Sequence, residues 1–150
     1  MKIAIGNDHG AVELKMHLVK YLEGKGVEVV NCGTDETKST DYPIYAARVA
    51  KKVLSGEVDK GVLICGTGLG ISMAANKIKG VRCAVCSEPV SAELARLHND
   101  ANIVAMGART IGPVMAEKIV DVFLNTAFEG GRHQQRVDMI MALGEGKEVE

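Results

Sequence analysis

The chain has 150 residues, of which 47% are hydrophobic and 25% charged, and its formal net charge is -1 at pH 7. A chain of this length can bury a core of its own, so we predict a single domain over residues 1–150. The balanced charge and an aromatic content of only 3% disfavour nucleic acid and anionic membranes as partners. No apolar run is long enough for a signal peptide or a membrane span, which predicts a cytoplasmic protein.

Short apolar runs alternate with amphipathic segments along the whole chain. In chain order, we predict a strand over Lys2–Gly6, a helix over Ala11–Leu22, a strand over Val27–Val30, a helix over Pro43–Leu54, a strand over Gly61–Cys65, a helix over Ile71–Ile78, a strand over Val81–Cys86, a helix over Pro89–His98, a strand over Ile103–Met106, and helices over Pro113–Asn125 and His133–Leu143. Asp41 is predicted to cap the helix that Pro43 opens.

Five strands separated by helices leave little room for hairpins. The predicted fold is therefore α/β, a three-layer αβα, Rossmann-like, doubly wound sheet of five parallel strands with an extra C-terminal helix. Such sheets bind ligands beyond the carboxyl ends of the strands, where the strand order reverses. In a flavodoxin-like order the first and third strands flank that point, so Asn7–Gly10 and Cys65–Gly70 are expected to face each other.

The segment Cys65–Gly70 reads CGTGLG and leads from a predicted strand into a predicted helix. It lacks one residue of the dinucleotide fingerprint, and no Lys-Ser/Thr pair follows as in a P-loop. A nucleotide site stays open as an alternative. A loop of unhindered backbone amides before a helix binds a negative oxygen in either case.

Cys65 has both a structural and a catalytic interpretation. A cysteine at the end of a strand is often only a packing residue. Here it would lie beside a helix N-terminus and several amides, which favour a thiolate that acts as nucleophile or base. His98 and Asn99 could complete a cysteine protease or acyl-transfer site, and this alternative also stays open.

Arg132 and Arg136 lie four residues apart and would share one face of the last helix. Paired guanidinium groups bind phosphate oxygens bidentately. Positive charge at a helix N-terminus opposes the helix dipole, so stability alone does not explain it. A substrate with one phosphate and one oxyanion-forming centre fits these residues better than an acyl donor, and His9 is a further candidate ligand.

Cys83 and Cys86 have the C-x-x-C spacing of a redox or zinc site. They fall in a predicted strand, where positions three apart point to opposite faces. We therefore predict structural thiols that share neither a metal nor a disulfide.

The chain resembles, from end to end, the type B ribose-5-phosphate isomerases, a family that includes the galactose-6-phosphate isomerase subunits. The segments that carry the resemblance are GNDHG at Gly6–Gly10, TDYP at Thr40–Pro43, ICGTGLGIS at Ile64–Ser72, SEPVSAELARLHNDANIVAMGAR at Ser87–Arg109 and EGGRHQQRV at Glu129–Val137.

The resemblance implies an aldose–ketose isomerase that acts through a cis-enediolate, with Cys65 as the base at carbon 2. Thr67 would move a proton between the two substrate oxygens. Backbone amides would hold the developing oxyanion, and the loop residues concerned are Gly66, Gly68, Leu69 and Gly70. One branch of the family uses a glutamate after the glycine loop instead, at a position that here is Ile71.

The resemblance also implies roles in ring opening and substrate binding. His98 would act on the ring oxygen and Asp8 on the anomeric hydroxyl, while Asn99 would hold substrate oxygens. The phosphate would be bound by Arg132, Arg136 and His9, and Tyr42 would line the pocket.

No cofactor is implied, and no metal, since the sequence shows no grouping of histidines and carboxylates typical of sugar-isomerase metal sites. The family implies a homodimer or a tetramer with shared active sites. Ribose 5-phosphate is the expected substrate; allose 6-phosphate, galactose 6-phosphate and a non-catalytic nucleotide- or sugar-phosphate-binding module are the alternatives.

Overall fold

The computed structural model describes all residues, 1–150. Its strands are β1 (Lys2–Asn7), β2 (Glu28–Asn31), β3 (Lys60–Cys65), β4 (Cys83–Val85) and β5 (Ile103–Gly107). Its helices are α1 (Val12–Gly24), α2 (Tyr42–Leu54), α3 (Leu69–Ala75), α4 (Pro89–Asn99), α5 (Pro113–Asn125) and α6 (Arg132–Gly144), with a 3-10 turn, η1, at His9–Ala11. All strand pairs are parallel, which confirms the predicted fold class.

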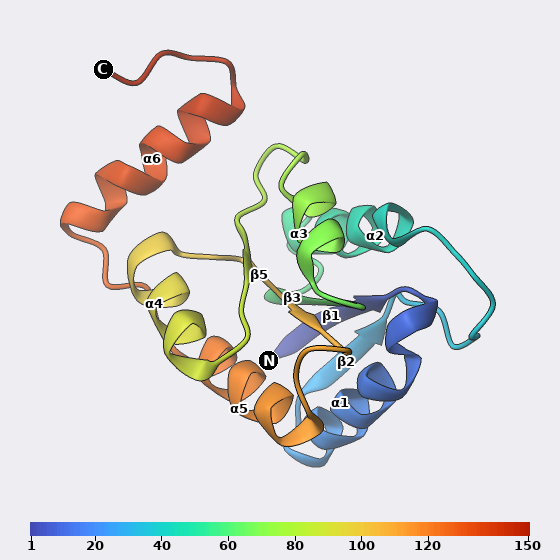
Figure 1. The fold of residues 1–150 in the computed structure, drawn as a ribbon. Coiled ribbons are helices and arrows are strands. Elements are labelled where there is room, and N and C mark those ends of the chain that lie inside the picture. Colours follow the sequence, from blue (N-terminus) through green and yellow to red (C-terminus); the bar gives the residue numbers. More distant parts are fainter.

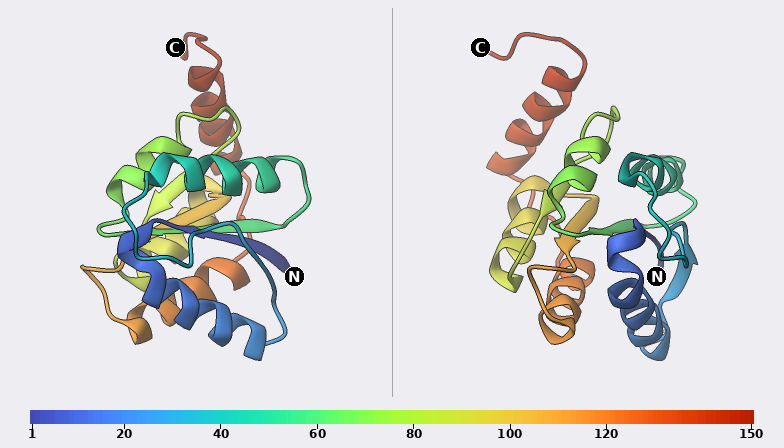
Figure 2. Two further views of the ribbon diagram at one scale, coloured as in Figure 1. Left: turned by 90° about the vertical axis from the view of Figure 1, so that its right-hand side faces the viewer. Right: turned by 45° about the vertical axis from the view of Figure 1, so that its right-hand side comes forward.

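Helices cover both faces of the sheet, with α1, α4 and α5 on one face and α2 and α3 on the other (Figures 1 and 2). Side chains of β3 alternate between the two layers, as the two-residue period of a strand requires. Val62 and Ile64 face the first layer, and Leu63 and Cys65 face the second. Cys65 is thereby held in a packed interior at the last position of a central strand.

The strand order is β2-β1-β3-β5-β4. The predicted adjacency of β1 and β3 is confirmed, but the flavodoxin-like order is wrong at the other edge, because β5 lies between β3 and β4. Asn7 pairs with Ile64, and Cys65 pairs with Gly107. Three neighbouring strands therefore end at the same level, and the loops after β1, β3 and β5 meet there.

Two predicted elements are shorter in the structure, α3 at its end and β4 at both ends. The Asn76 side chain accepts from the Cys83 N–H at 2.8 Å and donates to the Cys83 carbonyl at 2.9 Å. Lys77 and Ile78 form tight turns with hydrogen bonds to Ala74 and Ala75, three residues back, which end the helix.

Helix α6 extends away from the sheet and contacts the body through α4 (Figures 1 and 2). The prediction of an extra C-terminal helix is confirmed to within one residue at each end. Its large apolar side chains Met139, Ile140 and Leu143 are exposed. The helix thus presents an apolar face that this chain alone does not cover.

Candidate active site

Asp8 lies where the chain leaves β1 and crosses the end of β3. Its N–H donates to the carbonyl of Ile64 at 3.3 Å, and its Oδ1 accepts from the Gly10 N–H at 3.0 Å. A Cβ built on Gly10 would lie 3.9 Å from the Gly66 nitrogen. The loops after β1 and β3 therefore lie against each other, as predicted.

Cys65 is the last residue of β3 and is 4% exposed. Its Sγ accepts a hydrogen bond from the Gly68 N–H at 3.2 Å, so the glycine loop folds back over the sulfur. The thiol is buried on the sheet side and faces the loop.

Gly68 and Gly107 allow this loop to pack directly on β5. Gly68 has a φ of +79°, and a Cβ there would lie 2.8 Å from the Met106 backbone. A Cβ on Gly107 would lie 2.6 Å from the Thr67 backbone. Because side chains have no room at either position, the conformation of the loop is set by backbone contact with a neighbouring strand.

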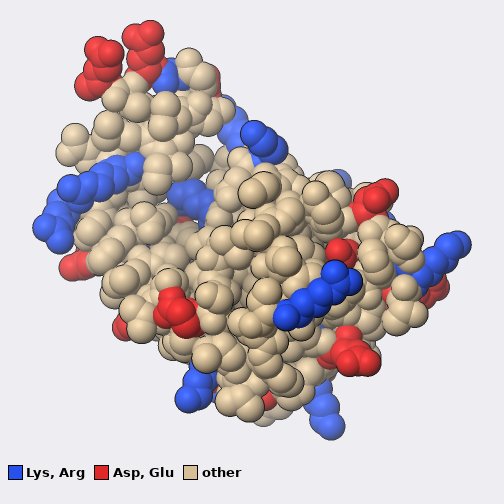
Figure 3. All heavy atoms as spheres, in the orientation of Figure 1, with Lys and Arg blue, Asp and Glu red and all other residues tan.

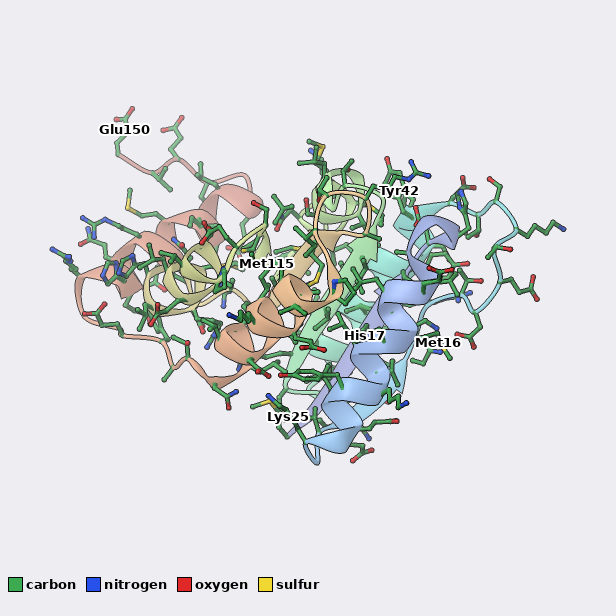
Figure 4. The ribbon with its side chains drawn as sticks, turned by 60° about the horizontal axis from the view of Figure 1, so that its bottom comes forward. Met16, His17, Lys25, Tyr42, Met115 and Glu150 are labelled. Atoms are coloured by element: carbon green, nitrogen blue, oxygen red, sulfur yellow. The ribbon has the colours of Figure 1, made fainter.

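The loop between β2 and α2, together with the first residue of α2, supplies the next wall of the site. Tyr42 packs over Gly70, where a Cβ would lie 2.6 Å from the tyrosine Cζ. His9 Nδ1 lies 3.2 Å from the backbone of Thr40, which leaves its Nε2 without a partner. Figure 4 shows Tyr42 beside the start of α1, with Lys25 marking the opposite end of that helix.

Arg109 belongs to this site and was missed as a site residue in the sequence. Its N–H donates to the Gly66 carbonyl at 2.9 Å, and its guanidinium would lie 3.3 Å from a Cβ on Gly66. The group forms no ion pair. Its position two residues after β5 could have identified Arg109 as a site residue. The predicted flavodoxin-like order, however, placed β5 away from β3. We call Asp8, His9, Tyr42, Cys65–Gly70 and Arg109 the strand-end group.

A cavity of about 540 Å³ adjoins the strand-end group on the side of α1. It is lined by His9 and Gly10 together with residues of α1 and of the loop after β5. Cys65 does not line it, so the cavity extends the site away from the thiol.

The remaining predicted residues lie at the opposite end of the sheet. Helix α4 begins after β4 and returns to the start of β5, where the Asn102 carbonyl accepts from Gly61 at 3.0 Å. The four residue steps of β5 separate the two ends by roughly 13 Å. His98 and Asn99 therefore do not approach Cys65 within one chain, and the cysteine protease arrangement does not form there.

A second set of residues, which we call the helix-end group, consists of His98, Asn99, Glu129, Arg132, His133 and Arg136. The rings of His98 and His133 stack with centroids 4.3 Å apart. Glu129 Oε2 lies 3.7 Å from His98 Nε2 and 3.5 Å from His133 Nε2. The sequence-based expectation that histidines and carboxylates are not grouped is wrong here, because the turn before α6 brings Glu129 back to the end of α4.

Arg132 and Arg136 are exposed on α6 and form no ion pair. Basic side chains lie over the start of this helix in the space-filling view (Figure 3). Arg132 and Arg136 lie one turn apart on the same face of α6, and the paired anion site stays a prediction. In this chain, however, the pair is remote from the strand-end group.

All four cysteines are free thiols. Cys83 and Cys86 pack against opposite layers of the sheet, which confirms the prediction that the strand directs them to opposite faces. Burial raises the pKa of Cys83 to about 12 and that of Cys86 to about 11. Raised pKa values favour the protonated thiols at neutral pH, and their structural role stays a prediction.

None of the helices combines the length and the apolar character needed to cross a membrane. The parallel sheet and its two helical layers define a doubly wound α/β protein, with a thiol, a glycine loop and an arginine without an ion pair at its strand ends.

Comparison with known proteins identifies the family. The model of the Ribose/Galactose Isomerase family matches residues 3–140. Ribose-5-phosphate isomerase B of Escherichia coli (strain K12) is 55% identical over 142 residues, which cover 95% of each chain. A galactose-6-phosphate isomerase subunit, LacB, of Clostridium acetobutylicum is 42% identical, with 91% of this chain and 79% of that protein covered.

The solved structure of Clostridium thermocellum ribose-5-phosphate isomerase B has a TM-score of 0.96 to this chain at 49% identity. The match covers 97% of this chain and 99% of that one. The chain belongs to the ribose/galactose isomerase family and is an enzyme of the isomerase class.

Proposed function

We propose that the chain interconverts D-ribose 5-phosphate and D-ribulose 5-phosphate, a reaction of the pentose phosphate pathway. The observation that carries the proposal is the position of Cys65, a buried thiol that accepts a hydrogen bond from an amide of the glycine loop, in a loop that also contacts Asp8 and Arg109. The higher identity to a ribose-5-phosphate isomerase than to a galactose-6-phosphate isomerase subunit supports the choice of substrate.

In the proposed reaction, Cys65 acts as a thiolate and removes the proton from carbon 2 of the open-chain sugar. The electron pair of that bond forms the cis-enediolate, and the proton returns to carbon 1. Thr67 moves a proton between the two oxygens. Amides of the loop stabilise the negative oxygen, as in an oxyanion hole, and the reaction needs neither a cofactor nor a metal.

Ring opening and binding involve both groups of residues. Asp8 takes the proton of the anomeric hydroxyl while His98 protonates the ring oxygen, and Asn99 holds substrate oxygens. Tyr42 lines the pocket. Arg132, Arg136 and His9 bind the phosphate, and we add Arg109, whose unpaired guanidinium lies at the loop.

This division requires a homodimer, or a tetramer built from such dimers, with shared active sites. One chain keeps His98 and the arginine pair more than about 13 Å from its own Cys65. A two-fold interface would bring the helix-end group of each chain to the strand-end group of the other and form two equal sites. The exposed apolar face of α6 suits such an interface.

A coupled assay that follows ribulose 5-phosphate formation tests the proposal. Turnover of ribose 5-phosphate above that of allose 6-phosphate and galactose 6-phosphate supports the assigned substrate. Turnover of none of the three, with retained binding of a sugar phosphate, would instead identify a non-catalytic binding module.

A further inference from the structure

The helix-end group contains three metal-ligating side chains that the proposed reaction does not use together. His98 Nε2, His133 Nε2 and a Glu129 carboxylate oxygen lie within 4.8 Å of one another. Two imidazoles and a carboxylate are the donor set of many zinc sites, and such sites keep an open fourth position when only three protein ligands are present.

His133 provides a second, independent observation. Its side chain is 10% exposed, and its Nε2 is buried without a hydrogen-bond partner. Buried polar atoms of folded proteins are normally paired, so an unpaired one at the centre of a donor cluster points to a missing ligand.

We propose that His98, Glu129 and His133 bind one divalent d-block cation of the zinc class. The two rings are stacked at an interplanar angle of 13°, so their in-plane lone pairs run side by side. Binding therefore turns the more exposed ring, that of His98, until both nitrogens and the carboxylate converge on the ion. Magnesium and calcium prefer oxygen ligands and are excluded by the two imidazoles.

The ion is an inhibitor and not a cofactor. This part rests on the proposed function, in which the His98 imidazole opens the sugar ring. A bound cation occupies the same Nε2 and removes it from that task. Inhibition should therefore be strong for cyclic ribose 5-phosphate and weaker for an aldose phosphate too short to form a ring.

The binding test uses the untagged full-length protein, freed of metal, and Co²⁺ as an optical probe for the zinc site. We expect the absorption bands of a four-coordinate cobalt complex with one equivalent bound per chain. Glu129→Gln should weaken binding at least about tenfold. This is the low end of the affinity loss when a group that only supports a metal ligand is removed, and Glu129 is a ligand itself. Glu129 is exposed, so this variant should fold.

Two control variants separate this site from others. Glu145→Gln removes a carboxylate at the end of α6 that contacts only lysines, and it should bind Co²⁺ as the wild type does. Cys65→Ala should also leave the spectrum unchanged, because no thiol is a ligand. An absent cobalt spectrum, a spectrum unaffected by Glu129→Gln or one lost in Cys65→Ala would overturn the site.

Zn²⁺ inhibition of ribose 5-phosphate turnover is the second measurement. Glu129→Gln should raise the inhibitory Zn²⁺ concentration by the factor by which it weakens cobalt binding. Equal inhibition of both proteins would overturn the inhibitory role. If the protein lacks isomerase activity, the proposed function fails, and the cobalt titration still decides the metal site on its own.

Discussion

The strand-end and helix-end groups differ in what holds them in place. Cys65 and its loop are clamped between β1 and β5 by backbone contacts that leave no room for side chains at Gly68 or Gly107. His98 lies at the end of α4 and Arg132 and Arg136 lie near the start of α6, a helix that extends away from the sheet (Figure 2). The sheet can preorganise the first group, whereas in the proposed dimer the second reaches an active site only through assembly. This contrast explains why one chain holds half of each proposed active site.

The largest expected effect separates the reactive thiol from the structural ones. Cys65→Ala should lower turnover by a factor of hundreds or more, because it removes the group that transfers the proton. Cys86→Ala is the matched control, a buried thiol on the other face, and should keep most of the activity. Steady-state kinetics and circular dichroism check both. A Cys65→Ala enzyme with half of the wild-type turnover would mean that another group is the base.

His98→Asn tests whether the helix-end group serves ring opening alone. Turnover of ribose 5-phosphate should fall by about a hundredfold, the low end for loss of a general acid. An aldose phosphate too short to cyclise should be affected far less, since its aldehyde is already free. Equal losses with the two substrates would contradict the separate roles of His98 and Cys65.

A mixture of the two defective variants Cys65→Ala and Arg136→Ala, assayed at low substrate concentration, tests whether the two groups meet across an interface. Arg136→Ala alone should weaken substrate binding about tenfold or more, since charge-assisted hydrogen bonds to phosphate are worth about 1.5–3 kcal/mol each. Mixed with Cys65→Ala, half of the dimers are heterodimers with one intact site, so activity should recover to about a quarter of wild type.

The control is a double variant that carries both substitutions in the same chain and is assayed without mixing. It should be inactive. Heterodimers verified by mass that stay inactive would show that each chain supplies its own phosphate ligands.

The smallest effect concerns the support of the strand-end group. The fully buried Lys15 pairs with Asp35 in the loop that leads to Tyr42. Hydrogen bonds from Lys15 and Asn31 lower the pKa of Asp35. A carboxyl with a depressed folded pKa adds stability above its unfolded pKa of about 4, and this contribution is lost as the pH falls through the folded value.

Asp35→Asn should therefore unfold at lower urea concentration than wild type at pH 7, and the difference should shrink as the pH falls below about 4. Turnover at pH 7 should change less than in any variant above. Urea titrations at several pH values measure this. A difference independent of pH would show that the charge of Asp35 does not contribute to stability.

Sequence reasoning located the strand-end group because parallel strands place their carboxyl ends on one edge of the sheet. Asp8, Cys65 and the glycine loop follow from that rule alone. Arg109 could not be located in this way, because apolar periodicity identifies strands but not their order in the sheet. The pairing of β5 with β3 depends on tertiary packing.

The helix-end group was harder to place for a different reason. The direction of α4 already implies that His98 lies far from Cys65, but the pairing of Glu129 with two histidines depends on the turn at Gly130 and Gly131. Both glycines have a positive φ, and the path they give the chain is not encoded in a local pattern. The resemblance supplied roles for these residues that spacing could not.

The position of β5 also affects how the chain folds. Gly61 pairs with Ile103, so 42 further residues must be synthesised after Gly61 before β5 can cover the second edge of β3. Pairings between distant segments form slowly, because the intervening loop must first be closed. During synthesis the glycine loop cannot pack against the backbone of Met106 and Gly107 until those residues have left the ribosome. Cys65 therefore reaches its finished surroundings late, when most of the chain has already been made.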